Sequence, residues 1–424
     1  MGLVRASADD KGPIDSKFME EAAELARGAE VLPEGVPALA RRLQEVKKQG
    51  RTLRVKLGID PTAMDLHLGH AVVVRKLKRF QEFGHQVVLI IGGFTARIGD
   101  PSGRNATRPA LSEAEVAANA ETYLNQMGVL LDIEKTEIVN NADWLGVLDL
   151  QKMLKLASSV TVNQLLAKEA FGERLDKQLP VSFHELFYPL LQGYDSVAIR
   201  SDIELGGTDQ RFNILQGREL QPYYGLEPQL AMLLPLLEGT DGVKKMSKTY
   251  NNYIALKDSP KDMFGKCMRI PDELILKYFE LATTFSGQQI DQIKHELEHG
   301  GNPRQAKIAL AKQITTQYCG ASAAEEVLNN WEIVHSQRQL PSQDQIPVHP
   351  VKPDTPLFRI LVDAGLASST SEAKRLIKEG AVQYCSQVVT DPNVSPFAIQ
   401  AGESSDQGNV LQVGRRKFLA LVRS

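Results

Sequence analysis

Apolar residues near the beginning of the chain follow two different periodicities. The run QVVLIIGG (86–93) is continuous and rich in β-branched residues, which is typical of a strand buried on both faces. Before it, the segment from Leu68 to Phe83 has apolar residues at helical spacing, and LRVKLGI (53–59) has the pattern of a short strand. Strand, turn, helix and strand within about forty residues predict a βαβ unit, and hence a parallel sheet with a right-handed crossover.

The same order of elements returns later in the chain. SDIELGGTDQRFNILQGREL repeats the sequence of strand, glycine turn and helix, and QLAMLLPLL is a further candidate strand. Helical spacing predicts an N-terminal arm of helices and a second helical region from Ser259 to about Val334. HSQRQLPSQDQIPVHPVKPDTP is rich in Gln, Ser and Pro and is typical of a linker, so roughly the last seventy residues are predicted to form a separate module.

Composition narrows the class of protein. The 424 residues suffice for two or three domains, and a net charge of −3 excludes a uniformly basic nucleic-acid coat, so any nucleic-acid surface must be a local patch. Cys267, Cys319 and Cys385 are far apart and form no CxxC pair, which favours a reducing compartment and argues against structural zinc. The polar N-terminus and the lack of an apolar run of membrane-spanning length predict a soluble, cytoplasmic protein without membrane association.

Two histidines, His67 and His70, follow the first predicted strand in GIDPTAMDLHLGH. They could form a metal site, a structural pair, or a phosphate-handling turn at the start of a helix. Ligands of open α/β sheets bind beyond the carboxyl ends of strands, where helix N-termini attract anions, and Gly69 lets a nucleotide approach the backbone. A zinc pair is less favoured because no third Cys or His stands nearby in the sequence, and a structural pair remains the alternative.

A second charged segment, IGGFTARIGDPSGR, directly follows the second predicted strand. It offers the carboxylate of Asp100 and the guanidinium of Arg104, with Arg108 four residues beyond. Arginines on a loop suit polyphosphate oxygens through bidentate pairing. A solvated turn explains the same residues, because Gly-Asp-Pro-Ser-Gly is common turn chemistry.

Two more segments carry candidate chemistry. GVKKMSKTYNNYI presents Lys245 and Lys248 on a loop after an apolar strand, where they could neutralise a leaving pyrophosphate; a solvated surface is the alternative. In FYPLLQGYDSVAI, Tyr188, Gln192 and Asp195 recur at helical intervals and lie along one helix face. If that face borders a pocket, its phenol, amide and carboxylate could bind the ammonium and the polar side chain of an amino acid.

Together and in this order, HLGH and KMSKT resemble the two signatures of class I aminoacyl-tRNA synthetases. Within that class the chain resembles the bacterial tyrosyl-tRNA synthetase family through GIDPTAMDLHLGH, IGDPSG, YPLLQGYD, ELGGTDQ and NPRQAKIALA. The resemblance covers nearly everything from Leu53 to the end. It implies an α/β fold with a helical N-terminal arm (1–52), a Rossmann-like parallel-sheet catalytic domain (53–258), an α-helical domain (259–335), a linker (336–356) and a small α+β S4-like RNA-binding domain (357–424).

The resemblance also implies a role for each matching residue. Around tyrosine it implies Lys56, Asp60, Thr95, Asp100, Tyr188, Gln192, Asp195 and Gln210, with Asp195 at the phenolic hydroxyl. For ATP it implies Thr62, His67, Gly69, His70, Gly207, Asp209 and Lys248. The implied catalytic set, which acts on the phosphates during transfer, is His67, His70, Arg104, Arg108, Lys245, Lys248 and Thr249.

This sequence departs from the family pattern at two positions in the amino-acid pocket. Lys56 stands where many members have a tyrosine that partners the substrate hydroxyl, and Glu204 replaces a glutamine. Lys56 could therefore pair with a carboxylate of the pocket instead of contacting the substrate. Thr249, where serine is frequent, keeps the hydroxyl.

The tail PLFRILVDAGLASSTSEAKRLIKEGAVQYCSQVV resembles an S4-type RNA-binding domain. Ser369 and Glu372 predict a capping box, and the helix that follows turns basic residues toward one side, namely Lys374, Arg375 and Lys378. Contacts with an RNA backbone need such a local basic patch. The alternative is a tail that serves only as a dimer or interdomain support.

The implied reaction has two steps. Tyrosine and ATP give tyrosyl-adenylate and pyrophosphate, and the tyrosyl group then passes to the 3′-terminal ribose of tRNA(Tyr). Mg²⁺ would arrive with ATP, so no dedicated metal site is expected, and the resemblance implies a homodimer. A tryptophanyl-tRNA synthetase, which shares fold and signatures, and a non-catalytic RNA-binding paralogue remain the alternatives.

Overall fold

The computed structural model describes residues 12–61, 65–101, 112–335, 346–385, 387–399, 409–414 and 417–423. Three residues predicted to bind phosphates, Thr62, Arg104 and Arg108, lie outside these ranges. The chain divides into two compact units, residues 1–324 and residues 325–424. Within the described ranges, no helix is both long enough and apolar enough to cross a membrane.

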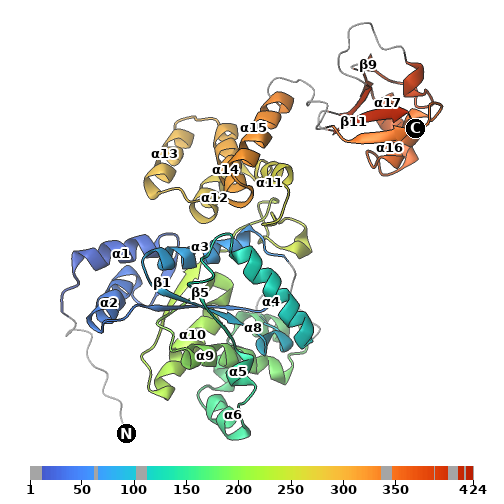
Figure 1. The fold of residues 1–424 in the computed structure, drawn as a ribbon. Helices are drawn as coiled ribbons and strands as arrows, with labels where there is room; N and C mark the ends of the chain where they lie inside the picture. Colours follow the sequence, from blue (N-terminus) through green and yellow to red (C-terminus); the bar gives the residue numbers. More distant parts are fainter. Residues whose placement is uncertain are drawn as a thin grey trace. The chain divides into compact units, whose positions relative to one another are not determined.

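The described part of the first unit contains a six-stranded sheet in the order β1-β6-β5-β2-β3-β4 (Figure 1). Neighbouring strands are parallel except β1 and β6, so the predicted parallel-sheet α/β class is confirmed. Two short strands, β1 and β4, were not predicted. The strands are β1 (Glu30–Leu32), β2 (Arg54–Ile59), β3 (Gln86–Ile91), β4 (Glu137–Asn140), β5 (Ile203–Gly207) and β6 (Leu230–Leu234).

The strand order reverses in the middle of the sheet. From β2 the chain passes through α3 (Leu68–Glu82) to β3, whereas from β5 it passes through α10 (Arg211–Leu220) to β6 on the other side. Because such crossovers are right-handed, α3 and α10 cover opposite faces, and α9 (Tyr188–Ala198) packs beside α10 (Figure 1). Ligands of open parallel sheets bind at the carboxyl ends of strands where the order reverses, here β2 and β5.

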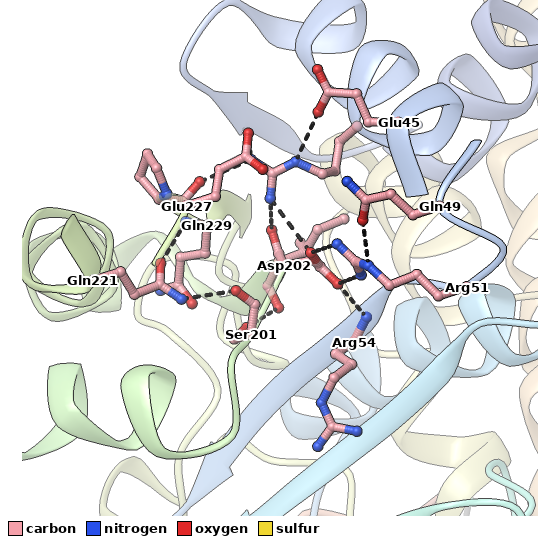
Figure 2. A network of polar contacts seen from close by, with 12 residues as sticks. Glu45, Gln49, Arg51, Arg54, Ser201, Asp202, Gln221, Glu227 and Gln229 are labelled. Carbon is pink, nitrogen blue, oxygen red and sulfur yellow. Dashed lines mark hydrogen bonds and ion pairs between the residues drawn. The ribbon is translucent and has the colours of Figure 1, made fainter. Parts of the chain in front are cut away.

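The N-terminal arm is anchored to this sheet. Helix α1 (Ser16–Ala26) packs on α2 (Gly35–Lys48), and β1 between them pairs with β6. The carboxylate of Asp202 accepts hydrogen bonds from the Arg51 guanidinium at 2.7 and 3.0 Å and from the Arg54 backbone N–H at 2.9 Å (Figure 2). Asp202 is buried, so these bonds offset the loss of water around its charge.

The remaining helices of the first unit fall into two groups. The helices between β3 and β5 include α4 (Glu113–Met127), α5 (Ala142–Leu145), α6 (Leu150–Ala157), α7 (Val162–Leu166) and α8 (Glu169–Asp176). The predicted helical region after Ser259 is confirmed as α11 (Pro260–Cys267), α12 (Ile275–Ala282), α13 (Gly287–Glu298), α14 (Pro303–Cys319) and α15 (Ala321–His335), the last of which continues into the second unit.

The second unit has a small sheet of its own. Its described strands follow the order β7-β11-β10-β8-β9 and pack with two helices around an apolar core, as predicted for an α+β module. The elements are β7 (Val348–Val351), α16 (Leu357–Asp363), α17 (Thr370–Lys378), β8 (Val382–Tyr384), β9 (Gln387–Val388), β10 (Val410–Val413) and β11 (Lys417–Arg423).

The capping box predicted at the start of α17 is only half correct. The Ser369 side chain does accept a hydrogen bond from the Glu372 backbone N–H, at 3.2 Å. The Glu372 carboxylate, however, accepts from the backbone N–H and the hydroxyl of Ser368, at 2.6 and 2.5 Å. Since the Ser369 backbone is fully extended (φ −157°, ψ 161°), the carboxylate meets the preceding residue instead.

Candidate active site

The carboxyl end of β2 is open although the middle of the strand is buried. Lys56 and Leu57 are buried, whereas Gly58 is exposed within the same strand. A Cβ atom built on Gly58 meets no described atom within 4 Å. Side chains alternate along a strand, so Lys56 and Gly58 face the same side, and Asp60 follows just beyond the strand end. Gly58 therefore leaves open space, here called the hollow, on this side of β2 between Lys56 and Asp60.

Asp195 of α9 is a buried hydrogen-bond acceptor. Its carboxylate accepts from the indole N–H of Trp144 at 2.8 Å and from the Asn141 amide at 3.3 Å. Burial raises the pKa of Asp195 to about 7, opposed by the attraction of the Lys56 ammonium. Such a group suits a ligand that donates a hydrogen bond, as a phenol does. Sequence reasoning did not find Trp144 and Asn141, which the unpredicted strand β4 and helix α5 bring to this pocket.

A second polar group lies at the end of β2. The Asp60 carboxylate accepts from the Tyr188 hydroxyl at 2.8 Å and from the Thr95 hydroxyl at 2.7 Å. A glycine is required beside it, because a Cβ at Gly92 would lie 1.9 Å from an Asp60 oxygen. Asp60, Thr95 and Tyr188, which were all predicted to lie around tyrosine, are thus in contact with one another through Asp60.

Asp100 and Gln210, also predicted around tyrosine, contact each other. The Gln210 amide donates to Asp100 at 2.7 Å, and its oxygen accepts from Asn213 at 2.9 Å. Lys168, which is buried, donates to Asn213 at 2.9 Å and lies 3.7 Å from the Asp100 carboxylate. Sequence reasoning missed Lys168 and Asn213, because in their local sequences they are indistinguishable from exposed helix residues.

Lys56 is fully buried and pairs with Glu204, their charged groups 2.9 Å apart. The suggestion that Lys56 pairs with a carboxylate of the pocket is therefore confirmed. Gln192 also donates to Glu204, at 3.1 Å. Lys56, which the resemblance placed around tyrosine, is thus enclosed together with Glu204, whereas Gln192 is partly exposed.

The two histidines stand at the start of α3. His67 precedes the helix, the His67 and His70 ring centroids are 3.9 Å apart, and the His67 backbone N–H donates to Nδ1 of His70 at 3.3 Å. Burial, the His70 ring and the Lys248 ammonium lower the pKa of His67 to about 2. The ring of His70 is accessible to water, yet the surrounding protein and the ammonium groups of Lys248 and Lys245 lower its pKa to about 4. Both imidazoles are therefore neutral at pH 7.

The lysine loop lies directly beside the histidine turn. The Leu68 N–H donates to the Ile254 carbonyl, and the Leu256 N–H donates to the Leu66 carbonyl, both at 3.0 Å. A Cβ built on Gly69 would lie 3.6 Å from Cβ of Met246 in KMSKT, an ordinary van der Waals contact, and 3.1 Å from the His67 ring, so Gly69 lies beside the lysine loop and leaves room for that ring. Two motifs about 180 residues apart in sequence thus lie side by side at the carboxyl ends of the parallel strands, where open α/β sheets have their ligand crevice.

Each signature lysine reaches a carboxylate at the edge of the crevice. Lys248 Nζ is 2.9 Å from Asp65, and Lys245 Nζ is 3.1 Å from Asp209. Both pairs are partly exposed, so exchanging the carboxylate for a phosphate oxygen costs little. Thr249, next to Lys248, is exposed. Gly207 leaves space for the Asp209 carboxylate, because a Cβ at position 207 would lie 2.6 Å from an Asp209 oxygen.

The donors of the crevice fit a nucleotide polyphosphate better than a protein-bound metal. Among the described residues, His67 Nδ1 is buried and has no hydrogen-bond partner, and no group of three or more His, Cys, Asp or Glu side chains could hold a metal ion. The zinc explanation of the histidine pair therefore finds no support in the described part of the chain.

A valine at Gly58 tests the hollow. Because the Cβ position of Gly58 is open, we expect Gly58→Val to fold normally and to raise the KM for the amino-acid substrate about tenfold, since its branches fill the ligand space. The KM for ATP should stay within twofold. Steady-state ATP–pyrophosphate exchange measures both constants, and an unchanged amino-acid KM would contradict this location of the pocket. Gly12→Val, at another open position without a positive φ, controls for the added side chain.

Comparison with protein families identifies two matching regions. The family described as tRNA synthetases class I (W and Y) matches residues 47–336, and the S4 domain matches residues 355–394. The first match covers the hollow, the histidine turn and the lysine loop; the second covers α17 with its basic residues.

Individual proteins agree with these matches. A tyrosine–tRNA ligase from Moorella thermoacetica is 49% identical over 94% of this chain and 94% of its own length, and one from Thermotoga maritima is 47% identical over 89% and 92%. Among solved structures, a truncated mitochondrial tyrosyl-tRNA synthetase from Aspergillus nidulans matches with a TM-score of 0.61 at 23% identity, covering 74% of this chain and 92% of its own. A tyrosyl-tRNA synthetase from Archaeoglobus fulgidus complexed with L-tyrosine matches with 0.58 at 22%, covering 73% and 99%. Both structures support the fold.

Proposed function

This chain belongs to the class I tRNA synthetases, and within them to the tyrosine–tRNA ligases; we propose that its crevice activates tyrosine with ATP and then transfers the tyrosyl group to the 3′-terminal ribose of tRNA(Tyr) in the cytoplasm. The observation that carries this proposal is the meeting of the histidine turn and the lysine loop. Lys245 of that loop also contacts Asp209, whose neighbour Gln210 donates to Asp100, one of the residues predicted around tyrosine. One crevice then holds the amino acid and the nucleotide together, as a two-substrate reaction requires.

The first step needs no protein nucleophile. An oxygen of the tyrosine carboxylate attacks the α-phosphorus of ATP, and the bond between that phosphorus and the oxygen of the leaving pyrophosphate breaks. In the second step a hydroxyl of the terminal ribose attacks the tyrosyl carbonyl carbon, and AMP leaves. The protein contributes position and charge, because negative charge grows on the pyrophosphate during the first step.

The amino acid lies in the hollow above Gly58. Its hydroxyl donates to Asp195, which Trp144 and Asn141 orient, and its ammonium meets Asp100, Tyr188 and Gln192 at the other end. Asp60 and Thr95 hold Tyr188 in place. Gln210 orients Asp100 through its amide, and its second N–H hydrogen remains for the substrate carboxylate.

The nucleotide lies between the histidine turn and the lysine loop. Neutral His67 and His70 donate to phosphate and ribose oxygens, Gly69 admits the nucleotide, and Gly207 with Asp209 binds the ribose. Lys245, Lys248 and Thr249 stabilise the pyrophosphate, together with the predicted Thr62, Arg104 and Arg108. Mg²⁺ is carried by ATP as part of the substrate.

ATP–pyrophosphate exchange with each of the twenty amino acids tests the proposed function. We expect exchange with tyrosine and none with tryptophan. Exchange with tryptophan alone would favour the tryptophan enzyme of the same class. Absence of exchange with every amino acid, in a folded protein that binds tRNA, would favour the non-catalytic paralogue.

We infer a homodimer, and exposed apolar side chains support a surface for it. They concentrate between residues 147 and 183 and include Leu150 (75% exposed), Leu154 (62%) and Phe183 (74%). Clustered apolar exposure marks interaction surfaces. We expect Leu150→Lys/Leu154→Lys to halve the mass of the particle in analytical ultracentrifugation. Val348→Lys/Val388→Lys, at side chains 62% and 55% exposed in the second unit, should leave a dimer, and a dimeric Leu150/Leu154 variant would contradict this surface.

The S4-like tail binds tRNA through its basic helix. Lys374, Arg375 and Lys378 are exposed on α17, and Lys374 lies over the Phe358 ring, 4.6 Å from its centre. Removing two phosphate contacts with Arg375→Ala/Lys378→Ala should lower the slope of log affinity for tRNA against log salt concentration by about 1–2. Tyrosine-dependent exchange should not change. Arg359→Ala, exposed on α16, is the matched control, and an unchanged slope in the double variant would remove these residues from the interface.

A further inference from the structure

Two opposite charges lie beneath the amino-acid hollow. Lys56 of β2 and Glu204 of β5 are register partners at the reversal of strand order, and their side chains are 0% and 1% exposed. Replacing such a buried ion pair by apolar residues is often neutral or stabilising for a fold. Stability alone therefore does not explain why charges occupy this position.

The pair has no bonding capacity left for a substrate. The Lys56 ammonium donates to Glu204 at 2.9 Å, to the Ser196 hydroxyl at 2.8 Å and to the Gln192 carbonyl at 2.9 Å, which engages its three hydrogens. The Glu204 carboxylate also accepts from Gln192, Ser196 and, at 2.6 Å, Gln229. Gln229 is itself held by Gln221 (Figure 2). The pair therefore acts through its neighbours.

Two of those neighbours, Gln192 and Ser196, lie one turn apart on α9, the helix that carries the residues proposed to face the substrate. Gln192 is held twice, by its carbonyl and by its amide nitrogen, and Ser196 is held four residues later. Because the Gln192 amide nitrogen is engaged by Glu204, its oxygen is the end of the side chain that can accept from an ammonium. Asp195 lies within the anchored turn, next to Ser196.

We propose that Lys56 and Glu204 form a positioning pair for amino-acid recognition, which fixes the 192–196 turn of α9 so that Gln192 and Asp195 meet the ammonium and the hydroxyl of tyrosine. The inference rests on the proposed function and assigns the pair to substrate affinity and selectivity, not to the phosphate chemistry. The nucleotide side of the crevice, at His67 and Lys248, is held by separate contacts.

An apolar replacement of matched length tests the pair. Lys56→Met/Glu204→Met removes both charges together, so no unpaired charge is left buried. We expect it to fold, to weaken tyrosine binding at least tenfold by titration calorimetry, and to lower the ratio of tyrosine to phenylalanine use at least tenfold. The KM for ATP and kcat at saturating tyrosine should stay within about threefold. Lys56→Met/Glu204→Gln restores an acceptor for the Gln192 amide and should bind tyrosine more tightly than the dimethionine variant.

The control is a second ion pair on the same strand. Arg54 and Glu137, the first residues of β2 and β4, are 2.8 Å apart, and Glu137→Gln, which removes this charge pair but keeps the Arg54 hydrogen bond to the Ile199 carbonyl at the end of α9, should leave tyrosine binding within twofold. The proposal would be overturned if the dimethionine variant bound tyrosine as tightly as wild type, or if it lost affinity for tyrosine and for ATP equally. It would also be overturned if the two Lys56/Glu204 variants bound tyrosine equally tightly, or if the dimethionine variant did not fold. A wild-type protein without tyrosine-dependent exchange would instead overturn the proposed function.

Discussion

Replacing Lys248 with alanine should slow tyrosyl-adenylate formation by a hundredfold to a thousandfold while leaving tyrosine binding nearly unchanged. The Lys248 ammonium lies beside the histidine turn, where it pairs with Asp65 at 2.9 Å and lowers the pKa of both imidazoles. Tyrosine carries no phosphate, so its ground state gains little from this cation. Losing one preorganised group that stabilises charge only in the transition state costs about 3–4 kcal/mol, which corresponds to this range of rates.

Single-turnover stopped-flow kinetics with saturating ATP measures the step directly. Equilibrium titration with tyrosine should give a dissociation constant within twofold of wild type. Lys277→Ala is a suitable control, since Lys277 is equally exposed and also pairs with a carboxylate, that of Glu238 at 2.7 Å. Wild-type rates in Lys248→Ala would refute the pyrophosphate role of this lysine.

The parts of the site that could be predicted are those that depend on local patterns of apolar residues in the sequence. The apolar run at 86–93 and the helical spacing after Leu68 each specify one element by periodicity, and together they identify the histidine turn as the start of a helix. Parallel topology then brings loops that follow strands to one edge of the sheet. The closeness of His67 and Lys248 follows from that rule, although no distance could be derived from it.

The parts that were not predictable depend on strand register and on short elements. The pairing of Lys56 with Glu204 requires β2 and β5 to align across 148 positions, and no local pattern contains that register. Strand β4 has four residues with alternating exposure at a sheet edge, so its apolar signal is weak, yet it leads to Asn141 and Trp144. Buried Lys168 reads as a solvated charge until tertiary contacts are known.

Replacing Asp195 with asparagine should lower the preference for tyrosine over phenylalanine by about tenfold to a hundredfold. A carboxylate accepts from Trp144, Asn141 and a phenol at once, and its hydrogen bond to the phenol is charge-assisted. Asparagine is neutral, keeps one acceptor oxygen and turns an amino group toward the donors around it, so roughly 1–3 kcal/mol of selective binding is lost. The ratio of kcat/KM values in ATP–pyrophosphate exchange measures the effect, and an unchanged ratio would remove Asp195 from hydroxyl recognition.

The same substitution should change how stability depends on pH. Burial raises the pKa of Asp195 to about 7 from an ordinary value of 3.8, so the folded protein binds this proton more tightly than the unfolded chain does. The group's stabilising contribution is complete below pH 3.8 and is lost as pH rises through 7. Between pH 5 and pH 8 the wild type should lose roughly 2–3 kcal/mol that Asp195→Asn retains. Thermal unfolding at both pH values should therefore favour the variant more at pH 8; an equal difference at the two values would mean that Asp195 is ionised throughout, held so by Lys56.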